Sequence, residues 1–147
     1  MTARELIQKH EGKRNRPYKC SAGHNTIGIG WNMDVNPLPK DIATYLSQNG
    51  MITNEMIDWL FDISLQIALS GCRSLFPVFD TFSSKRQLAL IDLVFQLGKN
   101  GVGKFKKSIS LINSEKWKEA AGEMLKSKWV KQTKNRSIEI TNMIREG

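Results

Sequence analysis

The chain has 147 residues, and its 22 Lys and Arg outnumber its 14 Asp and Glu to give a formal net charge of +8. This length suits one domain with its own core, and no apolar run approaches the roughly eighteen residues of a membrane span. Two cysteines and two isolated histidines offer neither a disulfide framework nor zinc spacing, so we expect no metal and no cofactor. The charge implies an anionic partner, but nucleic acid, membrane and cell wall all satisfy it.

The first predicted element is a helix over residues 2–10, with Leu6 and Ile7 on its apolar face. It delivers a carboxylic acid, Glu11, at its C-terminal end, and Gly12 suits the left-handed residue that follows a helix end. Residues 1–5 lack the apolar core of a secretion signal, so we expect no signal peptide. Read alone, Glu11 is more often an exposed glutamate than a catalytic group.

A hairpin is predicted next. Residues 17–20 and 26–29 are short β-prone runs, and the five residues between them have the composition of a turn. Pairing the two runs places Cys20 and Thr26 near each other, with Glu11 facing them. One group could protonate a leaving oxygen while another attacks or activates water, so the constellation suits acid-assisted hydrolysis.

The rest of the chain is predicted to be helical, so the expected fold is α+β with its only sheet near Cys20. A helix from Thr53 to Gly71 is apolar on two faces and must be buried on more than one side. The other expectations are a helix at 40–47, a helix at 84–98 stopped by Gly98, a turn at 99–103, helical stretches at 105–112 and 114–126, Trp129 in a connection, and a last helix capped by Thr133.

The spacing of Glu11, Cys20 and Thr26, followed by Ile-Gly-Ile-Gly at residues 27–30, resembles that of the phage-type lysozymes, the endolysins related to the T-even-phage enzyme. The likeness covers nearly the whole chain in order, through the blocks 94–98, 101–102, 117–121, 126–129 and 132–136. This family usually has Asp where the chain has Cys20, although one branch of it carries Cys.

The resemblance implies a single lysozyme-like domain over 1–147. Its parts would be a small sheet-bearing lobe at 12–53, a connecting helix at 54–73, and a helical lobe at 74–147 that includes helix 2–10. It implies a muramidase that cleaves the β-1,4 bond between N-acetylmuramic acid and N-acetylglucosamine in peptidoglycan. The role would be host cell lysis by a monomer made in the host cytoplasm, which reaches the periplasmic peptidoglycan through a lesion made by a holin-like membrane protein.

The resemblance also implies residue roles. Glu11 would be the general acid, oriented across the cleft by Arg136, and Thr26 would hold the attacking water or the substrate. For Cys20 two roles stay open, nucleophile and water-activating base, and we favour the nucleophile because a thiolate orients water less well than a carboxylate. The residues expected to bind substrate are Asn32, Phe95, Gln96, Ser108, Glu123, Trp129 and Arg136, although Asn32 and Glu123 differ from the family in side chain.

Two other functions remain. A lytic transglycosylase would use one acid and no attacking water on the same substrate. A basic helical nucleic-acid-binding protein would explain the charge but not the spacing of Glu11, Cys20 and Thr26, so we expect no nucleic-acid partner. The basic blocks 104–107 and 126–134 most often mean a solvated face, and could also draw an enzyme to anionic cell-wall polymer.

Overall fold

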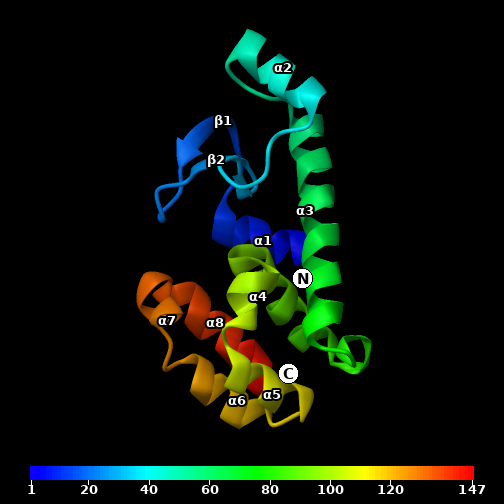
Figure 1. Ribbon diagram of the computed structural model, residues 1–147, viewed down its shortest axis with the longest axis vertical. Helices are drawn as coiled ribbons and strands as arrows, with labels where there is room; N and C mark the ends of the chain where they lie inside the picture. The colour runs from blue at the N-terminus through cyan, green and yellow to red at the C-terminus, as the bar shows by residue number, and fades with distance from the viewer. The chain divides into compact units, whose positions relative to one another are not determined.

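The computed structural model describes residues 1–147 and is mostly helical with one small antiparallel sheet (Figure 1), which confirms the α+β class. No helix combines the length and the apolar character needed to cross a bilayer. The elements are α1 (Ala3–Glu11), β1 (Arg14–Lys19), β2 (Asn25–Gly28), β3 (Trp31–Asn32), α2 (Lys40–Asn49), α3 (Asn54–Leu75), η1 (Phe79–Thr81), α4 (Ser84–Gly103), α5 (Lys106–Asn113), α6 (Trp117–Met124), α7 (Lys128–Gln132) and α8 (Lys134–Glu146).

The chain divides into two compact units. One, the sheet unit, is Arg4–Gln66, and the other, the helical unit, is Met1–Ala3 together with Ile67–Gly147. Both transitions fall inside helices, the first within α1 and the second within α3. The chain therefore passes from one unit to the other without a linker.

The sheet unit is built on strands in the order β1-β2-β3. Tyr18 pairs with Thr26 across the hairpin, and Thr26 pairs in turn with Asn32 of β3. The hairpin was predicted, but β3 was not, because two residues are too short to carry an alternating pattern. Apolar side chains from α1, the sheet, α2 and α3 make the core of this unit: Leu6, Ile7, Ile27, Ile29, Trp31, Ile42, Ile52, Ile57, Leu60 and Phe61.

The helical unit packs α8 against α4, α6 and α7, and α5 against α6. Near its centre the ring of Phe82 meets that of Trp117 edge-on at 4.9 Å, and the guanidinium of Arg86 lies 4.2 Å from the centre of the Trp117 ring. The largest fully buried side chains here are Phe76, Phe79, Leu90, Leu93 and Ile112. This unit holds a well-packed core of its own.

Several helix ends differ from the prediction. Gly98, with φ of 74° and ψ of 162°, interrupts the helix where the stop was predicted, but the chain resumes helical geometry after it, so residues 99–103 are helical instead of forming a turn. Trp129 lies within α7 instead of in a connection. Thr133 occupies the predicted N-cap position of α8, but its side chain accepts no helix N–H, and its hydroxyl donates to the Trp129 carbonyl at 3.1 Å. The predicted cap Thr53 is confirmed, since its hydroxyl accepts the Met56 N–H at 3.1 Å.

Candidate active site

Glu11 is the last residue of α1, and its carboxylate packs against the backbone of Gly30. Gly12 ends the helix with φ of 77° and donates its N–H to the Gln8 carbonyl at 2.8 Å. Gly30 lies between β2 and β3 with φ of 68°, and a Cβ on it would lie 2.9 Å from both Cδ and Oε2 of Glu11. Only glycine meets both the left-handed backbone and this close approach.

Tyr18 is a neighbour of Glu11 that the sequence did not point to. Its hydroxyl donates to the Glu11 carbonyl oxygen at 3.5 Å, and the Gly30 N–H bonds to the same hydroxyl. Burial, and next the Glu11 charge, raise the pKa of Tyr18. The Arg14 guanidinium lies 4.6 Å from the ring centre. Tyr18 therefore braces the end of α1 against β1, and the only signal in the sequence was its place in the β-prone run 17–20.

Cys20 immediately follows β1, in the turn of the hairpin. Its N–H donates to the His24 carbonyl at 3.0 Å, and its carbonyl accepts the Gly23 N–H at 2.8 Å. Burial raises the pKa of the Cys20 thiol, but hydrogen bonds from the backbone of His24 and Ala22 and from the Thr26 side chain outweigh it, and the net pKa lies below the usual range. The turn thus surrounds the sulfur with donors that favour the thiolate.

The charge of Glu11 acts on Cys20 in the opposite direction and favours the thiol. The Glu11 carboxylate therefore lies near enough to Cys20 for its charge to affect the ionisation of the thiol. Thr26, on β2, lies beside Cys20, and the catalytic roles of the three residues stay predictions. Their chemistry is complementary, since one group can donate a proton and another can attack as an anion.

The Thr26 hydroxyl has two partners. It is 3% exposed, donates to the His24 carbonyl at 2.9 Å, and also lies within hydrogen-bond reach of the Cys20 sulfur. A hydroxyl has a single proton, so it cannot donate to both groups at once. While Cys20 is a thiol, its S–H can donate to Thr26; once Cys20 ionises, the Thr26 hydroxyl must turn toward the sulfur. The direction in which the Thr26 hydroxyl donates can therefore change with the charge on Cys20.

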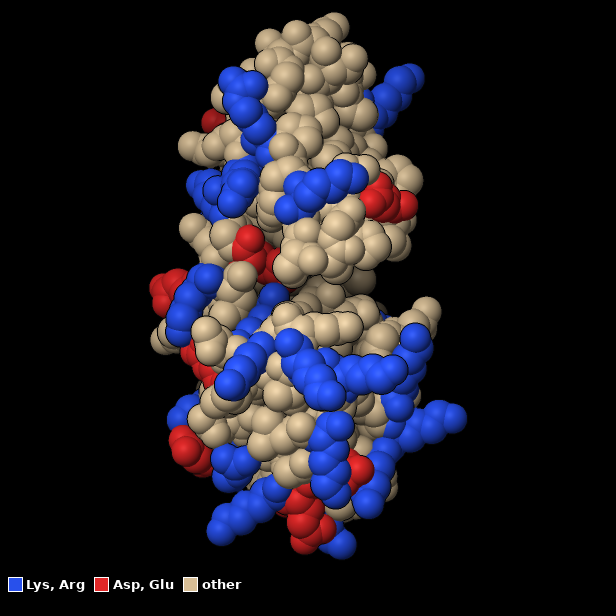
Figure 2. All heavy atoms as spheres, turned by 90° about the vertical axis from the view of Figure 1, so that its left-hand side faces the viewer, with Lys and Arg blue, Asp and Glu red and all other residues tan.

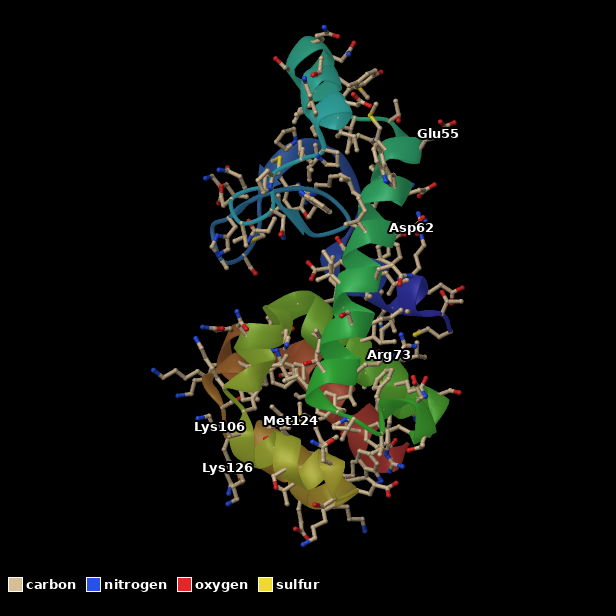
Figure 3. All side chains as sticks on the ribbon, turned by 45° about the vertical axis from the view of Figure 1, so that its right-hand side comes forward. Glu55, Asp62, Arg73, Lys106, Met124 and Lys126 are labelled. Carbon is tan, nitrogen blue, oxygen red and sulfur yellow. The ribbon has the colours of Figure 1, made fainter.

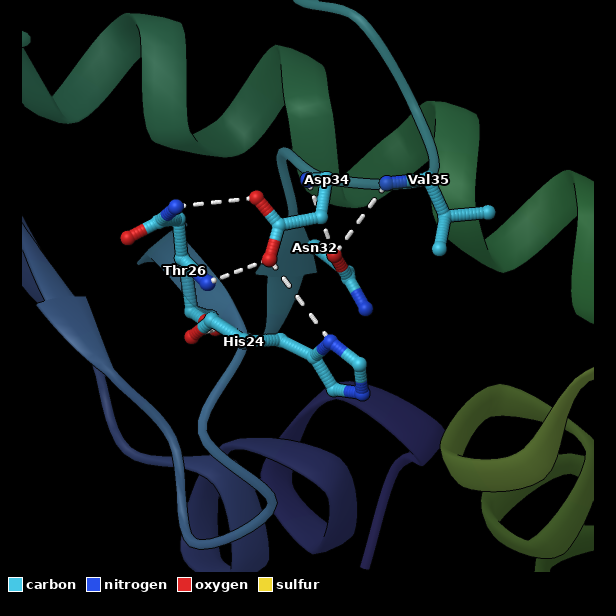
Figure 4. A network of polar contacts seen from close by, with 6 residues as sticks. His24, Thr26, Asn32, Asp34 and Val35 are labelled. Atoms are coloured by element: carbon cyan, nitrogen blue, oxygen red, sulfur yellow. Dashed lines mark hydrogen bonds and ion pairs between the residues drawn. The ribbon is translucent and has the colours of Figure 1, made fainter.

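A polar network supports the turn (Figure 4). The Asp34 carboxylate accepts the backbone and side-chain N–H groups of Asn25, both at 2.9 Å, and lies 3.6 Å from Nδ1 of His24. The two bonds from Asn25 lower the pKa of Asp34. Asn32 Oδ1 accepts the N–H groups of Asp34 and Val35 at 2.9 and 3.3 Å. Asn32, predicted as a substrate contact, thus holds the chain after β3, which carries Asp34, through its side-chain carbonyl oxygen.

Among the predicted substrate contacts of the helical unit, Gln96 and Trp129 meet directly. Trp129 Nε1 donates to Gln96 Oε1 at 3.0 Å, and the ring centres of Trp129 and Phe105 are 6.4 Å apart. Trp129 is only 4% exposed, as a core residue would be. Phe95 precedes Gln96 on α4 and is half-buried, and Ser108 on α5 is buried.

Glu123 and Arg136 have charged partners. Glu123 Oε2 lies 3.3 Å from the Lys126 ammonium and 3.6 Å from that of Lys107, and the hydrogen bond from Lys126 is the main cause that lowers its pKa. Arg136 Nε donates to Asp92 Oδ1 at 2.9 Å, with the two side chains 10% and 0% exposed. Arg136 is therefore a paired and nearly buried cation at the start of α8.

Comparison with known proteins agrees with this arrangement. The family model for phage lysozyme matches residues 8–144. The chain belongs to the phage lysozyme family. It is 32% identical to "Probable T4-type lysozyme 1" of Dictyostelium discoideum over 98% of this chain and 94% of that protein, and 31% identical to "Probable T4-type lysozyme 2" of the same organism over the same shares.

A third relative is larger. The whole chain is 30% identical to a part, 28% of the length, of the "Pre-baseplate central spike protein Gp5" of Enterobacteria phage T4. As a member of the phage lysozyme family the protein is a glycosidase-type enzyme whose substrate is peptidoglycan.

Proposed function

We propose that this phage lysozyme is a muramidase that hydrolyses the β-1,4 bond between N-acetylmuramic acid and N-acetylglucosamine, and that it serves host cell lysis. The observation that carries the proposal is the meeting of Glu11, Cys20 and Thr26 in the sheet unit, with the Glu11 carboxylate packed against Gly30. An acid whose charge reaches a hydrogen-bonded thiol provides the two groups that glycoside hydrolysis needs.

In the mechanism we favour, Glu11 protonates the glycosidic oxygen as the bond from that oxygen to the anomeric carbon breaks. The Cys20 thiolate attacks the same carbon from the opposite face and forms a thioglycosyl intermediate. Water then displaces the sulfur, and the Glu11 carboxylate takes the water proton, which restores the thiolate and the acid. Two displacements give net retention at the anomeric carbon. The donors from the turn and from Thr26 stabilise the thiolate both before attack and on departure.

The primary test is clearing of outer-membrane-permeabilised cells, measured as loss of turbidity. Glu11→Gln keeps the shape and hydrogen bonding of the side chain but has no proton to supply, so clearing should fall by at least about a hundredfold. Near-normal clearing by folded Glu11→Gln would end the muramidase proposal. Mass spectrometry of the digest separates hydrolysis from lytic transglycosylation, since an anhydro product is one water lighter.

The role of Cys20 has its own test, the anomeric configuration of the first product as observed by NMR. We expect retention, near-complete inactivity of Cys20→Ala and partial activity of Cys20→Asp. An inverted product together with an inactive Cys20→Ala would show that Cys20 activates water instead of attacking carbon. Lysis by Cys20→Ala at the parent rate would leave the chemistry to Glu11 and Thr26.

The remaining roles are proposals as well. We propose that Asn32, Phe95, Gln96, Ser108, Glu123 and Trp129 contact the glycan and that Arg136 assists Glu11. Substitution of the contact residues should raise KM more than it lowers kcat. We also propose that the enzyme acts as a monomer and leaves the host cytoplasm only with a holin-like protein. Expression without a holin should then leave cells intact until their membrane is permeabilised.

A further inference from the structure

The net positive charge of the protein comes from one of its two units. The sheet unit carries seven Lys and Arg against seven Asp and Glu and is neutral, whereas the helical unit carries fifteen against seven. The helical unit thus holds the entire excess of +8. A charge imbalance with this distribution needs a local explanation, because general solubility would be served by charge on either unit.

Most of the excess comes from one stretch. Residues 99–134 contain ten Lys, no Arg and three Glu, and all ten Lys are exposed. We call these side chains the lysine surface: Lys99, Lys104, Lys106, Lys107, Lys116, Lys118, Lys126, Lys128, Lys131 and Lys134. Figure 2 shows Lys and Arg side chains gathered over one face of the helical unit.

Part of the lysine surface is held together by a shared carboxylate. Lys107 on α5 and Lys126 just after α6 both lie near Oε2 of Glu123. Two ammonium groups from different parts of the chain are therefore held at one carboxylate oxygen. Lys106 projects from the same side of the helical unit as Lys126 (Figure 3). Two ammonium groups on one carboxylate leave a local positive excess, and any anion that binds there meets more than one point charge.

The lysine surface lacks the features of two other anion-binding surfaces. A helix that lies on a membrane buries large apolar side chains beside its lysines. The exposed large apolar side chains of this protein all lie outside residues 99–134, at Met1, Val35, Met51, Trp59, Ile67, Val78 and Ile138. Proteins that bind single-stranded nucleic acid stack bases on exposed aromatic rings, whereas the three aromatic rings of this stretch are half-buried or buried.

The absence of Arg further narrows the class of anion that the lysine surface suits. The planar fork of Arg favours bidentate recognition of bases and of phosphates held in a fixed orientation. Lys also binds phosphate, but as a flexible, strongly hydrated point charge, which suits the phosphates of a flexible polymer. We propose that the lysine surface binds the hydrophilic, phosphate-bearing polyol polymers of the bacterial envelope and keeps the enzyme on the wall between cleavage events. This inference rests on the proposed function, since it is the wall substrate that favours such a polymer over duplex DNA.

The test measures binding of purified poly(glycerol phosphate), which has no bond for a muramidase to cleave. The variant Lys106→Gln/Lys107→Gln/Lys126→Gln removes three charges from the lysine surface. The control Lys13→Gln/Arg16→Gln/Lys40→Gln removes three exposed charges from the sheet unit. We expect the first variant to bind at least about tenfold more weakly and the control to bind nearly as the parent does. The slope of log Kd against log salt should fall by about 2 in the first variant only.

Equal losses in the two variants, or no loss in the first, would overturn the proposal. So would tighter binding of duplex DNA than of poly(glycerol phosphate) at equal phosphate concentration. Binding to phosphatidylglycerol vesicles that persists in high salt would overturn it too. Hydrolysis of soluble, polymer-free glycan fragments by the parent protein is measured in parallel. If the parent fails to hydrolyse them, the muramidase proposal fails and the binding result still stands.

Discussion

Gly30 lies so close to Glu11 that a methyl group on its Cα would stand 2.9 Å from the Glu11 carboxylate. We therefore predict that Gly30→Ala displaces the acid and lowers the rate of lysis by about a hundredfold, the cost of roughly 1 Å of misplacement. The matched control is Gly50→Ala, because Gly50 has φ of 72° and only the flexible end of Arg16 near its would-be Cβ, at 3.8 Å.

Both alanine variants should lose about 1–2 kcal/mol of unfolding free energy, since each places a Cβ on a left-handed backbone. Urea denaturation measures that cost, and the turbidity assay measures lysis. Parent-like lysis by Gly30→Ala, or an equal loss in Gly50→Ala, would contradict the idea that Gly30 seats Glu11.

The two cysteines should differ sharply in reactivity. Cys72 is fully buried, and burial raises its pKa to about 12, whereas the pKa of Cys20 is lowered and its side chain is partly exposed. Iodoacetamide should therefore label one thiol per native molecule and two per unfolded molecule. The labelling rate of Cys20 should rise with pH and reach half its maximum at a lower pH than in an unstructured peptide of the same sequence. A midpoint at or above that of the peptide would disprove the thiolate-stabilising turn.

Thr26 gives a way to test what stabilises the thiolate. Thr26→Val removes the hydrogen bond to Cys20, so the labelling midpoint should move to higher pH, whereas Thr26→Ser should keep it near that of the parent. If Cys20 is the nucleophile, the pH dependence of lysis should shift in the same direction. If Thr26 only positions water, Thr26→Val should lower kcat at every pH without moving the profile.

The ion pair between Arg136 and Asp92 should matter for stability. Asp92→Ala leaves a nearly buried guanidinium without this carboxylate and should cost about 3 kcal/mol of unfolding free energy. The comparison is Asp80→Ala, which breaks the exposed Arg73–Asp80 pair and should cost less than about 1 kcal/mol. Chemical denaturation of the two variants measures both values. Similar costs would mean that burial of the first pair is unimportant.

The parts of this site that could be predicted are those formed by residues close together in the sequence. The spacing of Glu11, Cys20 and Thr26 predicted their meeting, because a helix end followed by a hairpin brings such positions together. Tyr18 and Gly30 were not assigned to the site, because their contact with Glu11 depends on how α1 docks on the sheet. The pairing of Arg136 with Asp92, forty-four residues away, was not predicted either, because it depends on how α8 packs against α4.

The helix ends show another limit of local reasoning. Glycine weakens a helix wherever it occurs, and Gly12 and Gly98 are both left-handed in the structure. At Gly12 the chain leaves the helix for a strand, whereas after Gly98 it resumes helical geometry. The glycine signals the break, and only the residues that follow and their packing decide what comes next.

The route of the chain between its two units has a consequence for how such proteins are inherited. Because both transitions lie within helices, a recombination point that separated the units would cut α1 or α3 and leave each product with a broken helix. Recombination that exchanges one unit alone is therefore disfavoured, and we expect the sequence of both units to be transferred together. The T4 spike protein fits this view, since the complete chain aligns within a much longer protein.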